Sequence, residues 1–278
     1  MPRYRLVVEY DGQGFAGWQR QANGPSIQQA LADAVFAFTG ERRMPVGAGR
    51  TDAGVHALGQ VAHVDLGADW PDATVRAALN FHLKPQPIAV IRAARTSDDF
   101  HARFDAIERR YLYRIVNRRA LLALARGRAW HVSRPLDAAA MADAAEVLVG
   151  RHDFSSFRDT GCQARSPIKT LTALDIERDG AEIHVHVRAR SFLHRQVRAM
   201  VGTLVRVGEG KWTRADVAHA LARRDRAAAG PNAPAHGLYL AAVVYPMDLT
   251  LNAEQLEDGE AADHVDGDEG GGDPPGGP

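Results

Sequence analysis

The chain has 278 residues, of which 45% are apolar, and this is enough for one large domain or two smaller ones. No apolar run approaches the ~20 residues of a membrane span, and no apolar signal stretch follows Met1, so a cytoplasmic protein without membrane contact is expected. A single cysteine, Cys162, excludes an intramolecular disulfide framework and a cysteine-cluster metal site.

The formal net charge of zero hides an asymmetry. Nine of the 34 acidic residues, but none of the 34 lysines and arginines, lie in residues 252–278. Residues 1–251 therefore hold 25 acidic against 34 basic side chains, a net charge of about +9, which favours a polyanionic partner. Residues 248–278 are acidic and rich in glycine and proline, and we expect this tail to be disordered.

The predicted elements of the first part begin with a strand over residues 4–10. Ser26 and Gln29 have the spacing of a capping box, and apolar residues then recur at helical intervals until Gly40. Alternating apolar and polar residues predict a strand over 58–66. A helix over about 72–83 and strands over 88–94 and 107–117 complete an N-terminal half, residues 1–118.

The second part resembles this layout and forms a predicted C-terminal half, residues 119–247. Asp137 caps a predicted helix that runs through Val149 and stops at Gly150. The remaining predicted elements are strands over 168–178 and 181–190, helices over 193–207 and 214–223, and a strand over 238–245. Hairpin-like pairs dominate and the Rossmann glycine fingerprint is absent, so we predict an α+β fold with a mainly antiparallel sheet backed by helices.

The strand over 181–190 has two different faces. Ile183, Val185, Val187 and Ala189 share one face, and the other face carries His184, His186, Arg188 and Arg190. This pattern predicts a sheet that packs on helices on one side and is open to an anion on the other. In the next helix, His194, Arg195 and Arg198 lie off the apolar stripe. Arg198 is a candidate for pointing into a cleft, and a solvated helix face is the alternative.

A loop of eight residues, Gly49-Arg-Thr-Asp-Ala-Gly-Val-His56, contains one carboxylate, Asp52, between two glycines. Arg50 stands two residues before it, and a neighbouring guanidinium keeps a carboxylate ionised at neutral pH. An ionised carboxylate is what an aspartate nucleophile requires. An ordinary surface turn is the alternative, because Asp and Gly are common turn residues.

Three further motifs have open interpretations. Residues 109–114, Arg-Arg-Tyr-Leu-Tyr-Arg, place Tyr111 among arginines, either to stack an unpaired base or to pack beneath the sheet. His184 and His186 are spaced as strand metal ligands sometimes are, but no third ligand lies nearby, so no metal site is expected. Gly12, Gly14 and Gly17 fit no nucleotide-binding pattern and predict a close backbone approach. Cys162 is interpreted as structural.

Five motifs in order resemble the tRNA pseudouridine synthase A family over about residues 3–246. The most specific is the loop 49–56, followed by Gly59-Gln-Val61. The others are Tyr10-Asp-Gly12 with Gly17-Trp-Gln-Arg-Gln21, Phe100-His-Ala-Arg-Phe104 with Arg109-Arg-Tyr111, Phe192-Leu-His194 with Val197-Arg198, and Gly237-Leu-Tyr-Leu240. Two features depart from the family pattern: Lys84 between Leu83 and Pro85, and the acidic tail.

The resemblance implies an enzyme that isomerises uridine to pseudouridine at positions 38, 39 and 40 in the anticodon stem-loop of tRNA. It implies Asp52 as nucleophile, Arg198 as its ion-pair partner and Tyr111 packed on the target uracil. It further implies that Arg50 holds flipped-out RNA and that Leu238 lines the uracil pocket. The resemblance also implies a homodimer in which each chain has two similar halves around a basic cleft. It implies that no metal or organic cofactor is used.

Two rival functions come from other classes. A non-catalytic RNA-binding module would use the basic sheet face together with Tyr111, and a metal-dependent hydrolase would use His184 and His186. For the first of these, the Asp52 loop is the discriminating feature, because a pure RNA binder gains nothing from an anion that faces phosphates.

Overall fold

The computed structural model describes residues 1–22 and 24–246, so the predicted acidic tail lies outside the described residues. Ten strands form one sheet in the order β4-β1-β3-β10-β5-β9-β8-β7, with β2 beside β3 and β6 beside β5. The strands are β1 Arg3–Tyr10, β2 Val46–Gly47, β3 His56–Asp65, β4 Ile88–Thr96, β5 Glu108–Asn117, β6 Trp130–Val132, β7 Gly150–Asp153, β8 Ile168–Asp179, β9 Glu182–Ala189 and β10 Leu238–Val244.

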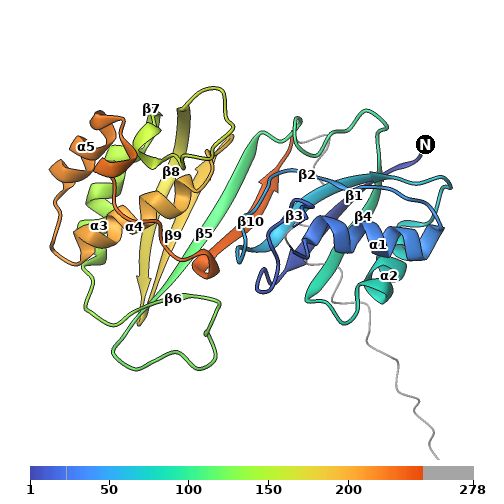
Figure 1. Ribbon diagram of the computed structural model, residues 1–278, viewed down its shortest axis with the longest axis horizontal. Coiled ribbons are helices and arrows are strands. Elements are labelled where there is room, and N and C mark those ends of the chain that lie inside the picture. Colours follow the sequence, from blue (N-terminus) through green and yellow to red (C-terminus); the bar gives the residue numbers. More distant parts are fainter. Residues whose placement is uncertain (23, 247–278) are drawn as a thin grey trace, which may run out of the picture. The chain divides into compact units, whose positions relative to one another are not determined.

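Five α-helices accompany the sheet in the described chain: α1 Ile27–Thr39, α2 Asp72–Leu83, α3 Ala138–Ala145, α4 Gln196–Gly208 and α5 Arg214–Arg223. Figure 1 shows α1 and α2 at one end of the sheet and α3, α4 and α5 at the other. Short 3-10 turns lie at Glu146–Leu148, Ser155–Phe157, Arg226–Ala228 and Ala235–Gly237. The predicted α+β class with a mainly antiparallel sheet is confirmed.

The last strand joins the two ends of the molecule. β10 lies between β3 and β5 in the middle of the sheet, parallel to β3 and antiparallel to β5 (Figure 1). β5 in turn pairs with β9 along most of its length. Strands distant in sequence therefore meet at the centre of one continuous sheet, and residues 1–245 form one compact unit.

The helix ends show where local sequence rules hold and where they do not. The Ser26 side chain accepts a hydrogen bond from the Gln29 backbone N–H, so the predicted cap exists. The reciprocal half of the capping box does not form, because the Gln29 side chain donates to Asp33 instead. α1 ends, as predicted, at Gly40, whose φ of 74° is easily adopted only by glycine.

Other boundaries differ from the predictions. The helix predicted to reach Val149 ends at Ala145 and continues as a 3-10 turn, and Gly150 then begins strand β7. The helix predicted from Leu193 begins at Gln196, because the Arg195 backbone is left-handed, with φ 61°. Strands β2, β6 and β7 were not predicted, since two to four residues carry too little periodicity to detect.

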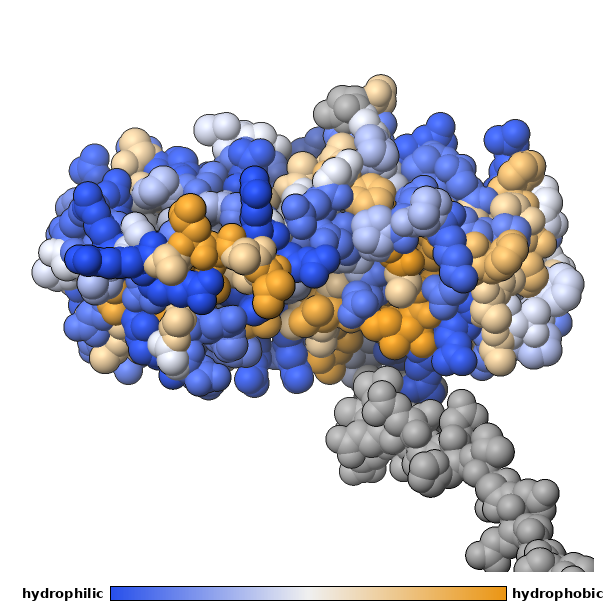
Figure 2. Space-filling view, turned by 90° about the horizontal axis from the view of Figure 1, so that it is seen from below, coloured by the Kyte–Doolittle hydropathy of each residue, from blue (hydrophilic) through white to orange (hydrophobic). Residues whose placement is uncertain are grey.

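The two-faced pattern of β9 is confirmed. Its apolar residues Ile183, Val185, Val187 and Ala189 are buried in the core beside α4, whereas the His and Arg residues on its other face are half-buried or exposed. Figure 2 shows another aspect of the surface, on which hydrophilic side chains dominate and apolar side chains gather in separate patches.

Two glycines let the N-terminal loop approach the Asp52 loop closely, as predicted. A Cβ atom on Gly12 would lie 2.1 Å from the Val55 carbonyl oxygen, and one on Gly17 would lie 2.5 Å from the Thr51 oxygen. Gly17 also has φ 109°, which side-chain-bearing residues rarely adopt. Gly12 and Gly17 therefore serve backbone-to-backbone packing around the Asp52 loop, whereas a Cβ atom on Gly14 would meet nothing within 4 Å, so the predicted close approach is wrong for Gly14.

His63 on β3 makes the stability of the fold depend on pH. Its ring is 6% exposed, and its Nδ1 atom accepts a hydrogen bond from the Ala102 N–H, 3.1 Å away. Burial first, and then the charges of Arg3 and His101, lower the pKa of His63 to about 4. The unfolded chain therefore binds a proton before the folded chain does, so stability is full above the unfolded pKa of about 6.5 and falls as the pH drops toward 4.

We expect the free energy of unfolding to fall by up to about 2 kcal/mol between pH 7 and pH 5 through this histidine alone. Urea titrations of the wild type and His63→Gln at both pH values measure it, and the variant should lose less stability on acidification. His219→Gln, at an exposed position on α5, is the matched control. Equal losses in wild type and His63→Gln would remove His63 as the cause.

Candidate active site

The loop that carries Asp52 connects β2 to β3 and is held from the N-terminal side. The Tyr10 hydroxyl lies 2.8 Å from the Thr51 Oγ1 atom, and the Trp18 N–H donates to the Thr51 carbonyl oxygen at 3.1 Å. Within the loop, the Val55 N–H donates to the Asp52 carbonyl oxygen at 3.1 Å, and Gly54 has φ 75°. These contacts close a tight turn at Asp52.

Three side chains at and just before the start of α4, those of His194, Arg195 and Arg198, surround the Asp52 carboxylate. Arg198 Nη1 lies 3.1 Å from Oδ2, and its Nε donates to the Ala233 carbonyl oxygen at 2.8 Å. His194 Nε2 lies 3.2 Å from Oδ1, and Arg195 Nε lies 3.9 Å from Oδ2. The side chains of Asp52 and Arg198 are 19% and 15% exposed, so this is a largely buried ion pair between residues 146 positions apart.

Arg50 does not have the position that its sequence proximity suggests. Its side chain is exposed at the edge of the cleft, and no hydrogen bond or ion pair joins it to Asp52 in the described chain. The expectation that Arg50 keeps the carboxylate ionised is therefore wrong. The guanidinium that contacts Asp52 is that of Arg198.

Tyr111 on β5 lies on the same side of the sheet as Asp52. It pairs with Val187 on β9 and Leu240 on β10, whose side chains belong to the buried face. Its ring makes an edge-to-face contact with Phe192, at 5.1 Å between centroids. Burial, and then the nearby Tyr10 and Asp52, raise the pKa of Tyr111 well above its usual value, so the ring is neutral.

The arginines around Tyr111 have roles that the sequence did not reveal. Arg109 is buried. Its guanidinium donates to the carbonyl oxygens of Ala48, Arg103, Ala106 and Arg190 and so links these backbone segments by hydrogen bonds. Arg110 and Arg114 occupy alternate positions on β5 and therefore face the opposite side from Tyr111. Of the three arginines, Arg109 alone shares the face of Tyr111, and its guanidinium is bound by backbone carbonyl oxygens.

A cleft of about 850 Å³ contains the residues that the sequence singled out. Asp52, Tyr111, Arg50 and Leu238 all line it, together with His194 and Phe192. Four arginines line the cleft, Arg50, Arg103, Arg109 and Arg195. The carboxylate among its lining residues is that of Asp52. Leu238 is 6% exposed, and Arg198 approaches Asp52 from behind the lining. The cleft thus combines one anion, an aromatic ring and a positive rim.

Two of these neighbours, His194 and Arg195, were assigned no role from the sequence. His194 belongs to a motif of the resembled family, but only the structure shows that its Nε2 atom lies 3.2 Å from Asp52 Oδ1. Cys162 also lines the cleft, and its Sγ atom accepts a hydrogen bond from the His194 N–H at 3.4 Å.

His184 and His186 lie on the other face of the sheet from Asp52. They pair with Arg114 and Leu112 on β5, and His184 Nε2 lies 2.9 Å from Glu182 Oε2. Over the described residues, no group of three or more His, Cys, Asp or Glu side chains could hold a metal ion. In the same part of the chain, none of the helices has the length and apolar character that crossing a membrane requires.

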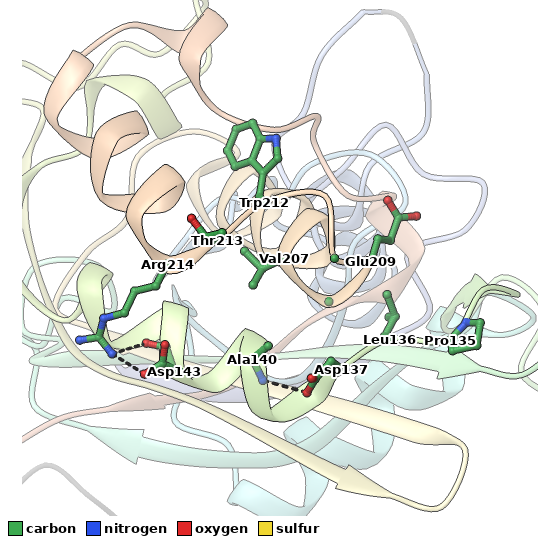
Figure 3. Close-up of a pocket in the computed structure, with 12 residues that line it drawn as sticks. Pro135, Leu136, Asp137, Ala140, Asp143, Val207, Glu209, Trp212, Thr213 and Arg214 are labelled. Carbon is green, nitrogen blue, oxygen red and sulfur yellow. Dashed lines mark hydrogen bonds and ion pairs between the residues drawn. The ribbon is translucent and has the colours of Figure 1, made fainter.

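A second hollow, of about 660 Å³, lies among the helices of the C-terminal part (Figure 3). Its polar groups are used within the fold. Arg214 pairs with Asp143 at 2.6 Å, and Asp137 accepts from the Ala140 N–H at 2.9 Å as the cap of α3. None of the candidate site residues lines this hollow, whereas Asp52, Tyr111, Arg50 and Leu238 line the cleft described above.

Comparison with known proteins gives concordant matches. The family model described as tRNA pseudouridine synthase matches residues 6–105 and 144–246. The chain is 58% identical to the tRNA pseudouridine synthase A of Maricaulis maris, over 88% of this chain and 99% of that protein. It is 61% identical to the protein of the same name from Rhodospirillum rubrum, over 91% of each chain. The relative from Azorhizobium caulinodans is 59% identical over 90% of this chain and 96% of its own length.

Proposed function

The chain belongs to the tRNA pseudouridine synthase family, and from this premise we propose that it isomerises uridines 38, 39 and 40 of the tRNA anticodon stem-loop with Asp52 as nucleophile. It is an isomerase with the α+β fold of that family, which converts uridine in tRNA to pseudouridine. The rival functions, a non-catalytic RNA-binding module and a metal-dependent hydrolase, are set aside.

The observation that supports Asp52 is its place in the cleft. It is the carboxylate of a positively lined cleft, it is paired with Arg198, and it shares that cleft with the neutral ring of Tyr111. A basic lining attracts the phosphate backbone of RNA. A carboxylate in such a place repels phosphate, so its presence indicates chemistry and not binding.

The reaction makes specific demands on these residues. The ribose–N1 bond breaks, the uracil rotates, and C5 bonds to the same ribose carbon, without redox change or net hydrolysis, so we propose that no cofactor takes part. The base must leave its stack, at a cost of a few kcal/mol. The Tyr111 ring offsets part of this cost, about 1–3 kcal/mol for a stacked base. Leu238 completes the apolar side of the uracil pocket, and Arg50 on the rim holds the displaced RNA.

Asp52 attacks either the uracil ring or the ribose carbon, and both routes need an ionised and aimed carboxylate. Arg198 places its guanidinium 3.1 Å from Asp52 Oδ2. Because the Arg198 guanidinium is also fixed by the Ala233 carbonyl oxygen, it holds Asp52 in one orientation. Water must be excluded during the step in which the base and ribose are separated.

Mapping pseudouridine in tRNA tests the proposed substrate. Unmodified tRNA transcripts with uridines at 38, 39 and 40 are incubated with the purified protein, and pseudouridines are located by chemical derivatisation and primer extension. We expect modification at these three positions and at no uridine outside the anticodon stem-loop. Modification only at other positions would overturn the assignment of the stem-loop while leaving the isomerase activity in place.

Three further parts of the proposal follow from family membership. We propose that the enzyme is a homodimer, that residues 1–118 and 119–247 are two similar halves, and that it acts in the cytoplasm, where tRNA is modified. Sedimentation of the purified protein measures the first of these directly.

A further inference from the structure

His194 lies between two carboxylates at the edge of the cleft. Its Nε2 atom is 3.2 Å from Asp52 Oδ1, and its Nδ1 atom is 3.4 Å from Asp159 Oδ1. Arg195 makes a second, parallel link, with Nη1 2.9 Å from Asp159 Oδ2 and Nε 3.9 Å from Asp52 Oδ2. Asp159 is thus joined to Asp52 through two adjacent side chains.

Asp159 is itself firmly placed. Its Oδ1 atom accepts from the Gly161 N–H at 3.0 Å, its backbone N–H donates to the His194 carbonyl oxygen at 3.2 Å, and its side chain is 16% exposed. Burial would raise the pKa of Asp159, but the Gly161 hydrogen bond and the charges of Arg195 and His194 outweigh it, so the pKa is lowered. Asp159 is therefore an anion that holds both side chains from behind.

The backbone at this point is unusual. Arg195 has φ 61°, a left-handed conformation that is uncommon for a residue with a side chain. The preceding residue, His194, is held by two backbone hydrogen bonds. Its N–H donates to Cys162 Sγ at 3.4 Å, and its carbonyl oxygen accepts from the Asp159 N–H. Residues in such conformations persist where their surroundings fix them, and they concentrate at functional sites.

We propose that His194 is a positioning residue which, tethered by Asp159, holds the Asp52 carboxylate in the orientation from which it attacks the target nucleotide. This inference rests on the proposed role of Asp52. Arg198 donates to Oδ2 at 3.1 Å and the His194 Nε2 atom lies 3.2 Å from Oδ1, so each oxygen of the carboxylate has a neighbour that limits its rotation. A misplacement of about 1 Å at a reacting atom costs on the order of 10²-fold in rate.

Substitutions at His194 test this with a built-in comparison. The amide nitrogen of glutamine reaches about as far as the imidazole Nε2, toward Asp52, whereas that of asparagine reaches only as far as Nδ1, toward Asp159. We expect His194→Ala and His194→Asn to lower kcat by about 10- to 100-fold with KM for tRNA unchanged within about twofold. His194→Gln should recover most of the lost kcat. A simple loss of folding would not distinguish glutamine from asparagine.

Asp159→Asn should lower kcat less, and the part of its effect that acts through His194 should disappear in the His194→Ala background, where only the link through Arg195 remains. Asp153→Asn is the matched control, since Asp153 lies on the same segment and accepts from Ser155 but contacts neither His194 nor Arg195. We expect it to change the melting temperature but not kcat. Single-turnover rates and filter binding of tRNA give kcat and affinity separately.

Wild-type kcat in a folded His194→Ala protein would overturn the inference, and so would equal activity of the glutamine and asparagine variants. A rise in KM alone would assign His194 to RNA binding and would also overturn it. Asp52→Ala is measured in the same series. If that variant is active, the proposed nucleophile fails; if it is inactive while His194→Ala is fully active, only the positioning role fails.

Discussion

Asp52→Ala is expected to lower the rate of pseudouridine formation by at least about 10³-fold while leaving tRNA binding nearly intact. The reason is chemical: the proposed nucleophile is lost, and removal of such a group costs several orders of magnitude in rate. Binding is retained, since the positive rim of the cleft does not depend on this carboxylate, and removing an anion from a basic cleft slightly favours RNA. Asp52→Asn should behave in the same way.

Tritium release from tRNA labelled at uracil C5 measures this prediction, because the C5 hydrogen leaves only when the new bond forms. Filter binding measures tRNA affinity in parallel. Asp33→Asn, an exposed residue on α1, is the matched control and should have wild-type activity. An Asp52→Ala protein that retains activity within about tenfold of the wild type would rule out Asp52 as the nucleophile.

Arg198→Ala is expected to have the second largest effect, a loss of about 10²-fold or more in kcat. Arg198 is the guanidinium that pairs with Asp52 and is itself fixed by the Ala233 carbonyl oxygen, so its removal leaves the carboxylate less well aimed and partly buried without its closest cation. Arg198→Lys should have an intermediate kcat. An ammonium group carries the charge but lacks the planar guanidinium geometry with which Arg198 donates to Ala233 and Asp52 together.

Single-turnover kinetics on labelled tRNA separate the effect on chemistry from the effect on binding. Arg206→Ala is the control, since Arg206 lies two turns further along α4 and pairs at 3.8 Å with Glu209, away from the cleft. If Arg198→Ala raised KM but left kcat unchanged, Arg198 would hold RNA and not Asp52, and the proposed role of the ion pair would be withdrawn.

Local sequence rules were sufficient where neighbouring residues alone decide the structure. Ser26 and Gly40 mark the ends of α1, α5 runs over the predicted residues Arg214–Arg223, and the alternation in β9 gives its two faces. The glycines after β1 indicated a close approach, although only the structure shows that Thr51 and Val55 are the partners. Pattern and cap chemistry act over a few residues, so they are readable from the chain itself.

The family and its reaction were also recognisable in the sequence, because the Asp52 loop and four further motifs occur in order. Residue spacing alone could not give which side chains meet Asp52; the family resemblance implied Arg198, and only the structure shows His194. Arg50 is the nearest in sequence and does not contact it, whereas Arg198 and His194 lie more than 140 positions away and do. Likewise, only the structure shows that Arg109 donates to four backbone carbonyl oxygens.

The sequence by itself thus determined the chemical groups of this enzyme: one loop carboxylate, an aromatic residue on a strand and a surplus of positive charge. The tertiary structure decided their partners, because β10 inserts between β3 and β5 and the left-handed Arg195 turns the start of α4 toward the Asp52 loop. Contacts between residues so far apart are set by strand pairing and core packing over the whole sheet, and no local pattern encodes them.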